Sequence, residues 1–354
     1  MNCIVKTASK LAMCFCLIFF LCTSSNAQEI LLSSGEKIDS LQYQKIEALA
    51  EEYFSVADSL DSYQKLNEAI LNYNESMKLF NQVDNWKRAT DVRLRIALAL
   101  LNQNEPDGLL HLDTAKHTLI LHNDTLSASY AMYFSNLSIY HSTKSEYSEA
   151  VELTRRAIGI LKTAESDTSE SLKLLHLDLG FYYGRLSELE KQIYHYEEAY
   201  RIMQFYKPDF GVAIALSRLS SCYLKTANFG KALNSTLKAR DLTIDLHGPD
   251  FPNLSNTYYW LGIIYKDMGE PEKAAQAYRE ALRIDSTILK GKTFNNSAVM
   301  RALESAYELG EYKKSNEIID TYIDRTASRY KGRANRYRAN NYLKLGKLKK
   351  HTLP

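Results

Sequence analysis

Residues 255–288 read SNTYYWLGIIYKDMGEPEKAAQAYREALRIDSTI, and this stretch decides the fold of the chain. It predicts two short helices, one over about residues 256–268 and one over about residues 271–284. Gly269 breaks the chain between them, and Pro271 suits the first turn of a helix, where its missing N–H is not needed. Large side chains recur at helical spacing, so each helix has an apolar face: Tyr258, Leu261, Tyr265, Tyr278 and Leu282.

Small residues stand where these two helices must nearly touch. They are Gly262 on the first helix and Ala274 and Ala281 on the second. A bulky side chain there would force the helices apart, because protein interiors are close-packed. The pattern resembles the tetratricopeptide repeat, with its closing proline replaced by Ser286. The resemblance implies an all-α fold, a right-handed superhelical solenoid of stacked helix-turn-helix repeats.

Further stretches of the chain fit the same pattern. The divergent second unit has Arg95-Ile96 where the pattern has Leu-Gly. We expect an array over residues 45–330, with units near 50–83, 89–122, 131–164, 173–206, 213–246, 255–288 and 296–329. The positions that carry the signature most clearly are Gly180, Ala199, Ala232, Ala239, Leu261, Gly262, Tyr265, Ala274, Tyr278 and Ala281. A period near 42 residues is similar to the kinesin-light-chain type of repeat and to exported bacterial arrays, including those fused to CHAT protease-like or signalling domains.

Residues 1–27 predict a secretory signal peptide. Lys6 and Lys10 precede an apolar run over residues 11–21, and small residues surround the expected cleavage point after Ala27. The run is too short for a membrane-spanning helix. We therefore expect a periplasmic or secreted protein. Membrane association is expected only if Cys22 carries a lipid, and Leu21 stands where a lipoprotein signal has a small residue.

The two ends of the array differ in composition. Residues 28–44 are predicted to form a polar lead-in, and residues 331–354 a basic C-terminal helix or partial repeat. From Arg325 to Lys350 the chain has ten Lys or Arg and no Asp or Glu. Three interpretations stay open: a solvated cap, docking onto acidic protein surface, or binding of a phosphate-bearing surface. No nucleic-acid partner is expected of an exported chain.

The sequence contains no recognisable catalytic or metal-binding constellation. His111, His117 and His122 are spaced by six and five residues, which does not place them on one helical face. Gly291-Lys292-Thr293 resembles the end of a phosphate-binding loop, but no strand precedes it. Cys222, the one cysteine outside the leader, is expected to be a buried apolar residue. We expect no enzymatic activity, no cofactor, no metal and no small-molecule substrate.

The resemblance implies a protein-binding groove. Stacked repeats leave a long concave surface lined by the first helix of each unit, which suits an extended peptide or a partner helix. In such repeats the second, fifth, ninth, twelfth and thirteenth positions line it. Carried over, they give Leu177, Phe181, Arg185, Ser217, Ser221, Leu224, Lys225, Asn256, Tyr259, Ile263, Lys266 and Asp267. The Lys and Asn of a carboxylate clamp are absent, so we expect a less charged ligand. Alternatively, Tyr259 and Phe181 only pack against neighbouring helices.

Two functions of different class follow. The first is an exported scaffold that binds a peptide or partner protein in its concave groove. The alternative is the sensory or regulatory array of a signalling regulator or CHAT-type protease whose output domain is absent from this chain, and the lack of an evident polar capping helix at the end of the array motivates it. A weaker third possibility is a glycan-binding lipoprotein, which requires a lipid on Cys22.

Overall fold

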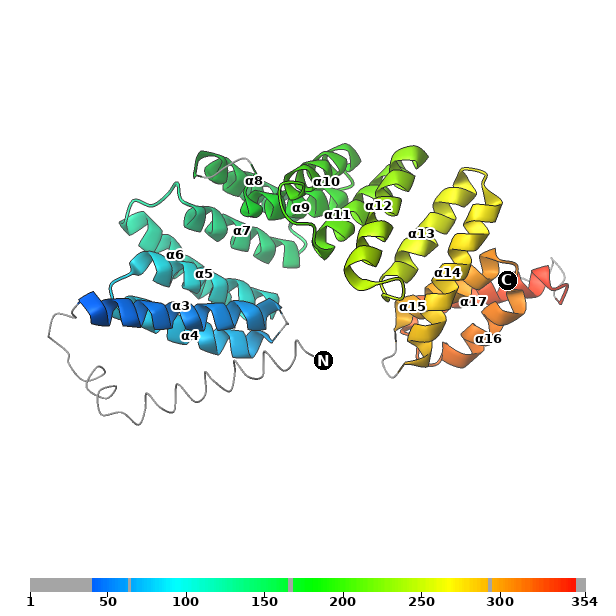
Figure 1. The fold of residues 1–354 in the computed structure, drawn as a ribbon, viewed down its shortest axis with the longest axis horizontal. Helices are drawn as coiled ribbons and strands as arrows, with labels where there is room; N and C mark the ends of the chain where they lie inside the picture. Colours follow the sequence, from blue (N-terminus) through cyan, green and yellow to red (C-terminus); the bar gives the residue numbers. More distant parts are fainter. Residues whose placement is uncertain (1–39, 63–64, 165–167, 292–294, 348–354) are drawn as a thin grey trace. The chain divides into compact units, whose positions relative to one another are not determined.

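The computed structural model describes residues 40–62, 65–164, 168–291 and 295–347. The predicted signal peptide, Lys292 and Thr293 lie outside the described residues. Within them the regular structure is fifteen α-helices and no strand, which confirms the all-α prediction. The helices are α3 (Ser40–Ser62), α4 (Leu66–Gln82), α5 (Trp86–Asn102), α6 (Asp107–Leu121), α7 (Ala128–Thr143), α8 (Tyr147–Ala164), α9 (Glu170–Arg185), α10 (Leu189–Met203), α11 (Phe210–Lys225), α12 (Phe229–His247), α13 (Leu254–Asp267), α14 (Pro271–Lys290), α15 (Asn296–Glu308), α16 (Tyr312–Tyr322) and α17 (Ser328–Lys344) (Figure 1).

The described residues divide into two compact units, those up to Ala99 and those from Leu100 onward. In the first unit α3 packs against α4, and the Ser76 hydroxyl of α4 donates a 2.8 Å hydrogen bond to the Ala50 carbonyl of α3. In the second unit α7/α8, α9/α10, α11/α12, α13/α14 and α15/α16 pack as successive pairs, and α17 packs on α15 and α16. Among the described residues, no helix has the length and apolar character needed to cross a membrane.

Four of the first helices begin at side-chain caps, whereas α13 has no side-chain cap. Ser127, Ser169, Asp209 and Asn295 accept hydrogen bonds from the backbone N–H three residues on, at the starts of α7, α9, α11 and α15. Such caps satisfy N–H groups that have no partner inside the helix. The first described helix, α3, begins at Ser40 and includes the last residues of the stretch expected to be a lead-in, and α17 begins at Ser328, just before the stretch expected to be a basic C-terminal helix or partial repeat.

The opening stretch forms the predicted helix pair, α13 and α14, joined by a turn in which Gly269 has φ 77°. This left-handed conformation carries no steric cost for glycine. However, α14 continues to Lys290, beyond the predicted end near residue 284. The extension has a simple cause. Ser286 stands where the repeat pattern has a helix-breaking proline, and a serine does not remove the backbone N–H on which the helix depends.

Complementary side-chain sizes join the two helices of a pair. A Cβ on Gly180 would lie 2.4 Å from the Tyr196 ring, and a Cβ on Gly262 would lie 2.5 Å from the Tyr278 ring. The equivalent contact between α11 and α12 uses two small polar residues instead, because the hydroxyls of Ser220 and Thr236 are 2.6 Å apart. In two of these three pairs a tyrosine on the second helix therefore faces a glycine on the first, and in the third two small residues face each other.

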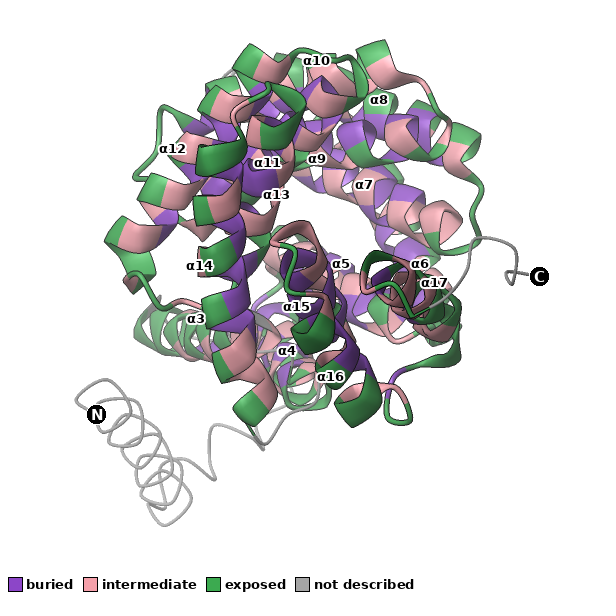
Figure 2. Cartoon of the chain, turned by 90° about the vertical axis from the view of Figure 1, so that its right-hand side faces the viewer, coloured by how far each residue is buried: buried purple, intermediate pink, exposed green. Residues whose placement is uncertain are grey.

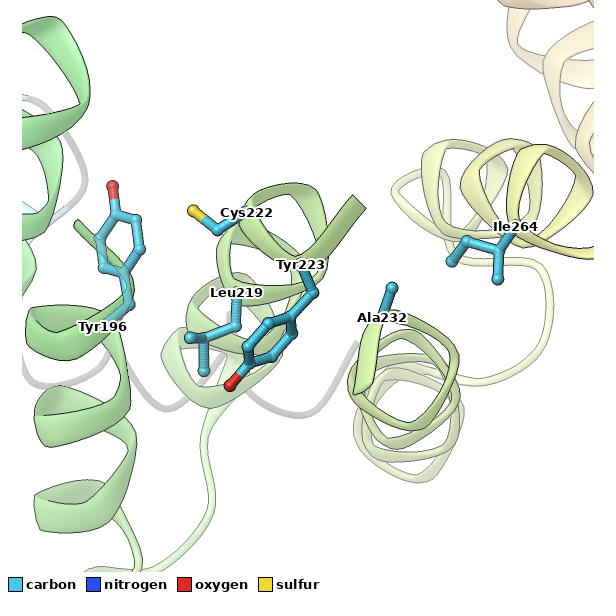
Figure 3. Packing of buried hydrophobic residues seen from close by; sticks show 6 residues of the cluster. All are labelled: Tyr196, Leu219, Cys222, Tyr223, Ala232 and Ile264. Atoms are coloured by element: carbon cyan, nitrogen blue, oxygen red, sulfur yellow. The ribbon is translucent and has the colours of Figure 1, made fainter. Parts of the chain in front are cut away.

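The signature positions predicted for the repeat lie inside the array. Nine of them are buried and Tyr265 is half-buried; the buried set is Gly180, Ala199, Ala232, Ala239, Leu261, Gly262, Ala274, Tyr278 and Ala281. These contacts continue from one pair to the next. Tyr196, Cys222, Tyr223, Ala232 and Ile264 belong to one cluster drawn from α10, α11, α12 and α13 (Figure 3). Cys222 is buried as expected, and burial raises the pKa of its thiol to about 11.

Candidate functional site

The candidate site is the side of α9, α11 and α13 that faces away from their partners α10, α12 and α14. Within residues 100–354, Figure 2 shows α7, α9 and α11 forming one layer and α8, α10 and α12 the other. We call this surface the first-helix face. It comprises the twelve groove positions predicted above together with Leu174 and Ile214.

On α9 the face is apolar. Phe181 is 43% exposed and Leu174, seven residues earlier, is 54% exposed. Leu177 lies between them in sequence and is half-buried, because it packs against the cluster around Tyr196 and Leu219. Arg185 ends the helix in an exposed position, with its guanidinium carbon 5.2 Å from the centre of the Tyr147 ring. Residues at these spacings share one side of a helix, so α9 presents an apolar strip, interrupted by the half-buried Asp178 between Leu174 and Phe181.

The face continues on α11 with smaller and more polar groups. Ile214 is 43% exposed, and Lys225 at the helix end is exposed. The hydroxyl of Ser217 donates a 2.9 Å hydrogen bond to the Ala213 carbonyl of its own helix. Ser221 is half-buried, and Leu224 packs on the core cluster between the helix pairs. The exposed apolar part of α11 is therefore the single residue Ile214.

On α13 the predicted positions are divided between solvent and the next repeat. Asn256 and Asp267 are exposed, and Ile263 is half-buried. Tyr259 donates a 2.6 Å hydrogen bond from its hydroxyl to Oε2 of Glu304 on α15. Lys266 Nζ of α13 forms a 2.6 Å ion pair with the carboxylate of Glu308, which is also on α15. Tyr259 and Lys266 thus link neighbouring repeats, as the packing alternative anticipated for Tyr259.

Two acidic residues of α15, Glu304 and Glu308, contact this part of the face and were not among the predicted positions. Glu304 also pairs with Arg333 of α17, with Nε and Oε1 2.7 Å apart. Burial raises the pKa of the Glu304 carboxyl above its ordinary value, while the Tyr259 hydrogen bond and Arg333 act in the opposite direction. Glu304 and Glu308 are the ninth and thirteenth residues of the unit at 296–329, so carrying the pattern one repeat further would have found them.

Leu174 and Ile214 were also missed. Each occupies the second position of its unit, at 173–206 and 213–246, and the same pattern therefore contained them. Together with Phe181 they are the large apolar side chains that the first-helix face exposes most, at 54%, 43% and 43%. Exposed apolar groups gathered on one surface mark binding sites. The site is thus apolar at α9, and polar and internally paired at α13 and α15.

The titratable groups near the face bear on whether it could hold a metal ion or a charged pair. No group of three or more His, Cys, Asp or Glu residues suited to a metal ion occurs within the part of the chain that the structure describes. His176 of α9 and His195 of α10 have their Nδ1 atoms 3.0 Å apart, and Tyr183 stacks on His195. Burial lowers the pKa of each imidazole to about 4. At neutral pH the pair is uncharged and hydrogen-bonded.

The comparisons with known proteins agree with this architecture. Residues 211–287 match the family model for the tetratricopeptide repeat. Superkiller protein 3 of Schizosaccharomyces pombe is 21% identical over 221 residues, and this match covers 43% of the chain but only 16% of that protein.

Several solved structures share the helical-repeat fold of this chain. The apo form of RapI superposes with a TM-score of 0.65 at 14% identity, covering 84% of this chain and 82% of RapI. A signal transduction ATPase from Pyrococcus horikoshii, which carries a tetratricopeptide repeat sensor, has a TM-score of 0.59 at 16% identity, covering 86% of this chain and 44% of the ATPase. Cut9 in complex with Hcn1 has a TM-score of 0.52 at 14% identity, covering 74% of this chain and 46% of that chain. At these identities the likeness concerns the fold alone.

Proposed function

We propose that this chain, which is a tetratricopeptide repeat protein, is an exported scaffold that binds a peptide or a partner protein on its first-helix face. Proteins of this class generally serve protein–protein interaction. The observation that carries the proposal for this chain is the exposed apolar strip of α9 and α11, formed by Leu174, Phe181 and Ile214. These residues are the anchors on which a ligand would bury apolar surface.

The difference between the paired residues of α13 and the exposed apolar residues of α9 and α11 indicates which part of the face would bind the ligand. Tyr259 and Lys266 already have partners on α15, so a ligand there would have to replace contacts within the protein. Leu174, Phe181 and Ile214 leave much of their side-chain surface exposed to solvent. Burial of apolar surface contributes about 25 cal/mol per Å². Binding is therefore expected to centre on α9 and α11, with Arg185 and Lys225 at its edge.

Site-specific photo-crosslinking in the producing organism tests this proposal. A photoreactive phenylalanine analogue is placed at Phe181, which is 43% exposed on the first helix α9, and in a second strain at Tyr194, which is 56% exposed on the second helix α10. We expect a discrete crosslinked species from position 181 and none from position 194. Equal labelling from both positions, or none from position 181, contradicts binding on the first-helix face.

Export is the second part of the proposal and rests on the basic, then apolar, then small-residue order of residues 1–27. Mass spectrometry of the protein recovered from producing cells tests it. A mature N-terminus at Gln28 in the periplasmic or secreted fraction is expected. A chain that retains its leader in the cytoplasm contradicts export, and a lipid on Cys22 would replace the soluble form with a membrane-anchored one.

A sensory array is the alternative function. It is favoured by the structural match to the ATPase that carries a tetratricopeptide repeat sensor, because this match covers 86% of the chain. On this hypothesis the array would regulate a separate output protein. A protease or kinase reading frame next to this one, together with co-purification of its product, would favour the sensor. A partner without any output activity favours the scaffold.

A further inference from the structure

The outward side of α6 differs from those of the second helices α8 and α14. Leu110 is 67% exposed and Leu121 is 77% exposed, although Leu112, Ala115 and Leu119 already form the buried side of the helix. Ile120 and Leu126 extend the apolar surface, at 45% and 68% exposure. A helix that is apolar on both sides is expected to be covered on both.

The second helices of other pairs provide the contrast. The exposed side of α8 carries charged residues, among them Glu149, Glu152, Arg155 and Arg156. The exposed side of α14 likewise carries Glu272, Lys273, Arg279 and Arg283. Charged residues on these helices follow the ordinary pattern of a solvated surface. The aliphatic residues of α6 are therefore a property of that helix and not of the repeat.

The outward stripe of α6 consists of Leu110, Thr114, His117 and Leu121, spaced by four, three and four residues. This is the spacing of the contact positions in paired helices. The Thr114 hydroxyl donates a 2.8 Å hydrogen bond to the Leu110 carbonyl of its own helix, so its polar requirement is met without a partner. Nε2 of His117 lies 3.8 Å from Oδ2 of Asp113, one helical turn earlier. The stripe is thus apolar at both ends and carries its polar residues in the middle.

The stripe is also symmetric about its own centre, between Ala115 and Lys116. Leu110 lies as far before this point as Leu121 lies after it, and the same holds for Thr114 and His117. A two-fold axis through the centre would set a second α6 antiparallel on the first. Leu110 would then face Leu121 of the second copy, and Thr114 would face His117 of the second copy. A self-complementary surface of this kind is what an isologous dimer requires.

We propose that this chain self-associates through α6, with a second copy of the same chain packing its α6 antiparallel on the first. The contact is small. A helix of 15 residues is about 22 Å long, and one helix-on-helix contact falls well below the roughly 1,600 Å² buried by standard stable interfaces. The dimer is therefore weak and concentration-dependent. It uses a second helix and leaves the first-helix face of α9, α11 and α13 open.

Sedimentation velocity of the purified full chain, from roughly 1 μM to roughly 1 mM, measures the association. Wild type is expected to shift from monomer to dimer across this range. The variant Leu110→Glu with Leu121→Glu places like charges opposite each other at both ends of the stripe and is expected to remain monomeric. The matched control is Leu71→Glu on α4, since Leu71 is also 67% exposed, and it should associate like wild type.

A charge-complementary variant tests the antiparallel orientation. Leu110→Lys with Leu121→Glu places opposite charges together only when the two helices run antiparallel, and it should associate at least tenfold more tightly than the double glutamate variant. Far-UV circular dichroism verifies that each variant is folded. Wild type that is monomeric throughout, a double glutamate variant that dimerises normally, or a charge-complementary variant no tighter than the double glutamate one would each overturn the proposal.

Discussion

Gly262 of α13 packs against the ring of Tyr278 of α14: a Cβ on Gly262 would lie 2.5 Å from Cε1 of the tyrosine ring. Real Cβ atoms do not approach other atoms so closely, so the absence of a side chain at position 262 determines how near the two helices come. Tyr278 is 3% exposed, and because protein interiors are close-packed, a shift of its ring would disturb its neighbours.

The first prediction follows from that contact. Gly262→Ala is expected to lower the free energy of unfolding by about 1–3 kcal/mol, because the new methyl group overpacks the Tyr278 ring. Gly159→Ala is the matched control, since Gly159 lies inside α8 with no atom within 4 Å of the Cβ position. There the better helix propensity of alanine should stabilise by about 0.5–1 kcal/mol. Urea unfolding measures both, and equal effects would show that the Gly262–Tyr278 contact is not tight.

The second prediction concerns Tyr259. Tyr259→Phe should lower the free energy of unfolding by about 1.5–3 kcal/mol, because it removes a hydrogen bond to a buried carboxylate. Glu304 is 2% exposed and would retain only Arg333 as a partner. Phe181→Ala changes an exposed side chain and should leave stability within about 0.5 kcal/mol of wild type. Thermal or urea unfolding compares the two. An unaffected Tyr259→Phe protein would leave that hydroxyl available for a ligand.

The third prediction is a loss of stability in acid caused by His176 and His195. Burial lowers the pKa of each to about 4 in the folded chain, against 6.5 for a free imidazole. The unfolded chain therefore binds more protons between these values, so stability is complete above about pH 6.5 and falls as the pH is lowered toward about 4. The groups around the pair are Glu198, Arg201, Lys162 and Arg155, of which the three cations oppose protonation.

The size of this effect is on the order of 2–4 kcal/mol for the pair. Urea unfolding at pH 7.5 and pH 5, with wild type and His195→Gln, isolates it from the titration of other groups. We expect wild type to lose more stability than the variant over this interval. Parallel losses in the two proteins would mean that the imidazoles titrate normally.

The fourth prediction has the opposite sign. Burial raises the pKa of Asp178 to about 7, and Arg218 only partly offsets this. Its folded pKa is above the ordinary value of 3.8, so the folded chain binds more protons between these values and stability falls as the pH rises from about 4 to about 7, where the loss is complete. Asp178→Asn removes the charge without changing the size of the side chain and should gain more stability over wild type at pH 8 than at pH 5. A stability gain of equal size at both pH values would exclude this explanation.

Much of the fold could be predicted from residues in a single repeat. Gly262, Ala274 and Ala281 indicated where α13 meets α14, and Gly269 indicated the turn, because these contacts join residues close in sequence. The end of α14 at Lys290 could not be predicted from the repeat pattern, since the usual proline is replaced by Ser286. Contacts between repeats were harder to predict from the sequence. The pairing of Tyr259 with Glu304 spans 45 residues and depends on how one helix pair stacks on the next.

The matched sizes at Gly180/Tyr196, Gly262/Tyr278 and Ser220/Thr236 also restrict how this protein could be re-engineered or diversify. A first helix taken from one repeat and joined to the second helix of another would either set the Ser220 hydroxyl against a tyrosine ring or leave a void beside Thr236. The helix pair, and not the single helix, is therefore the smallest module that can be shuffled, duplicated or deleted without loss of fit.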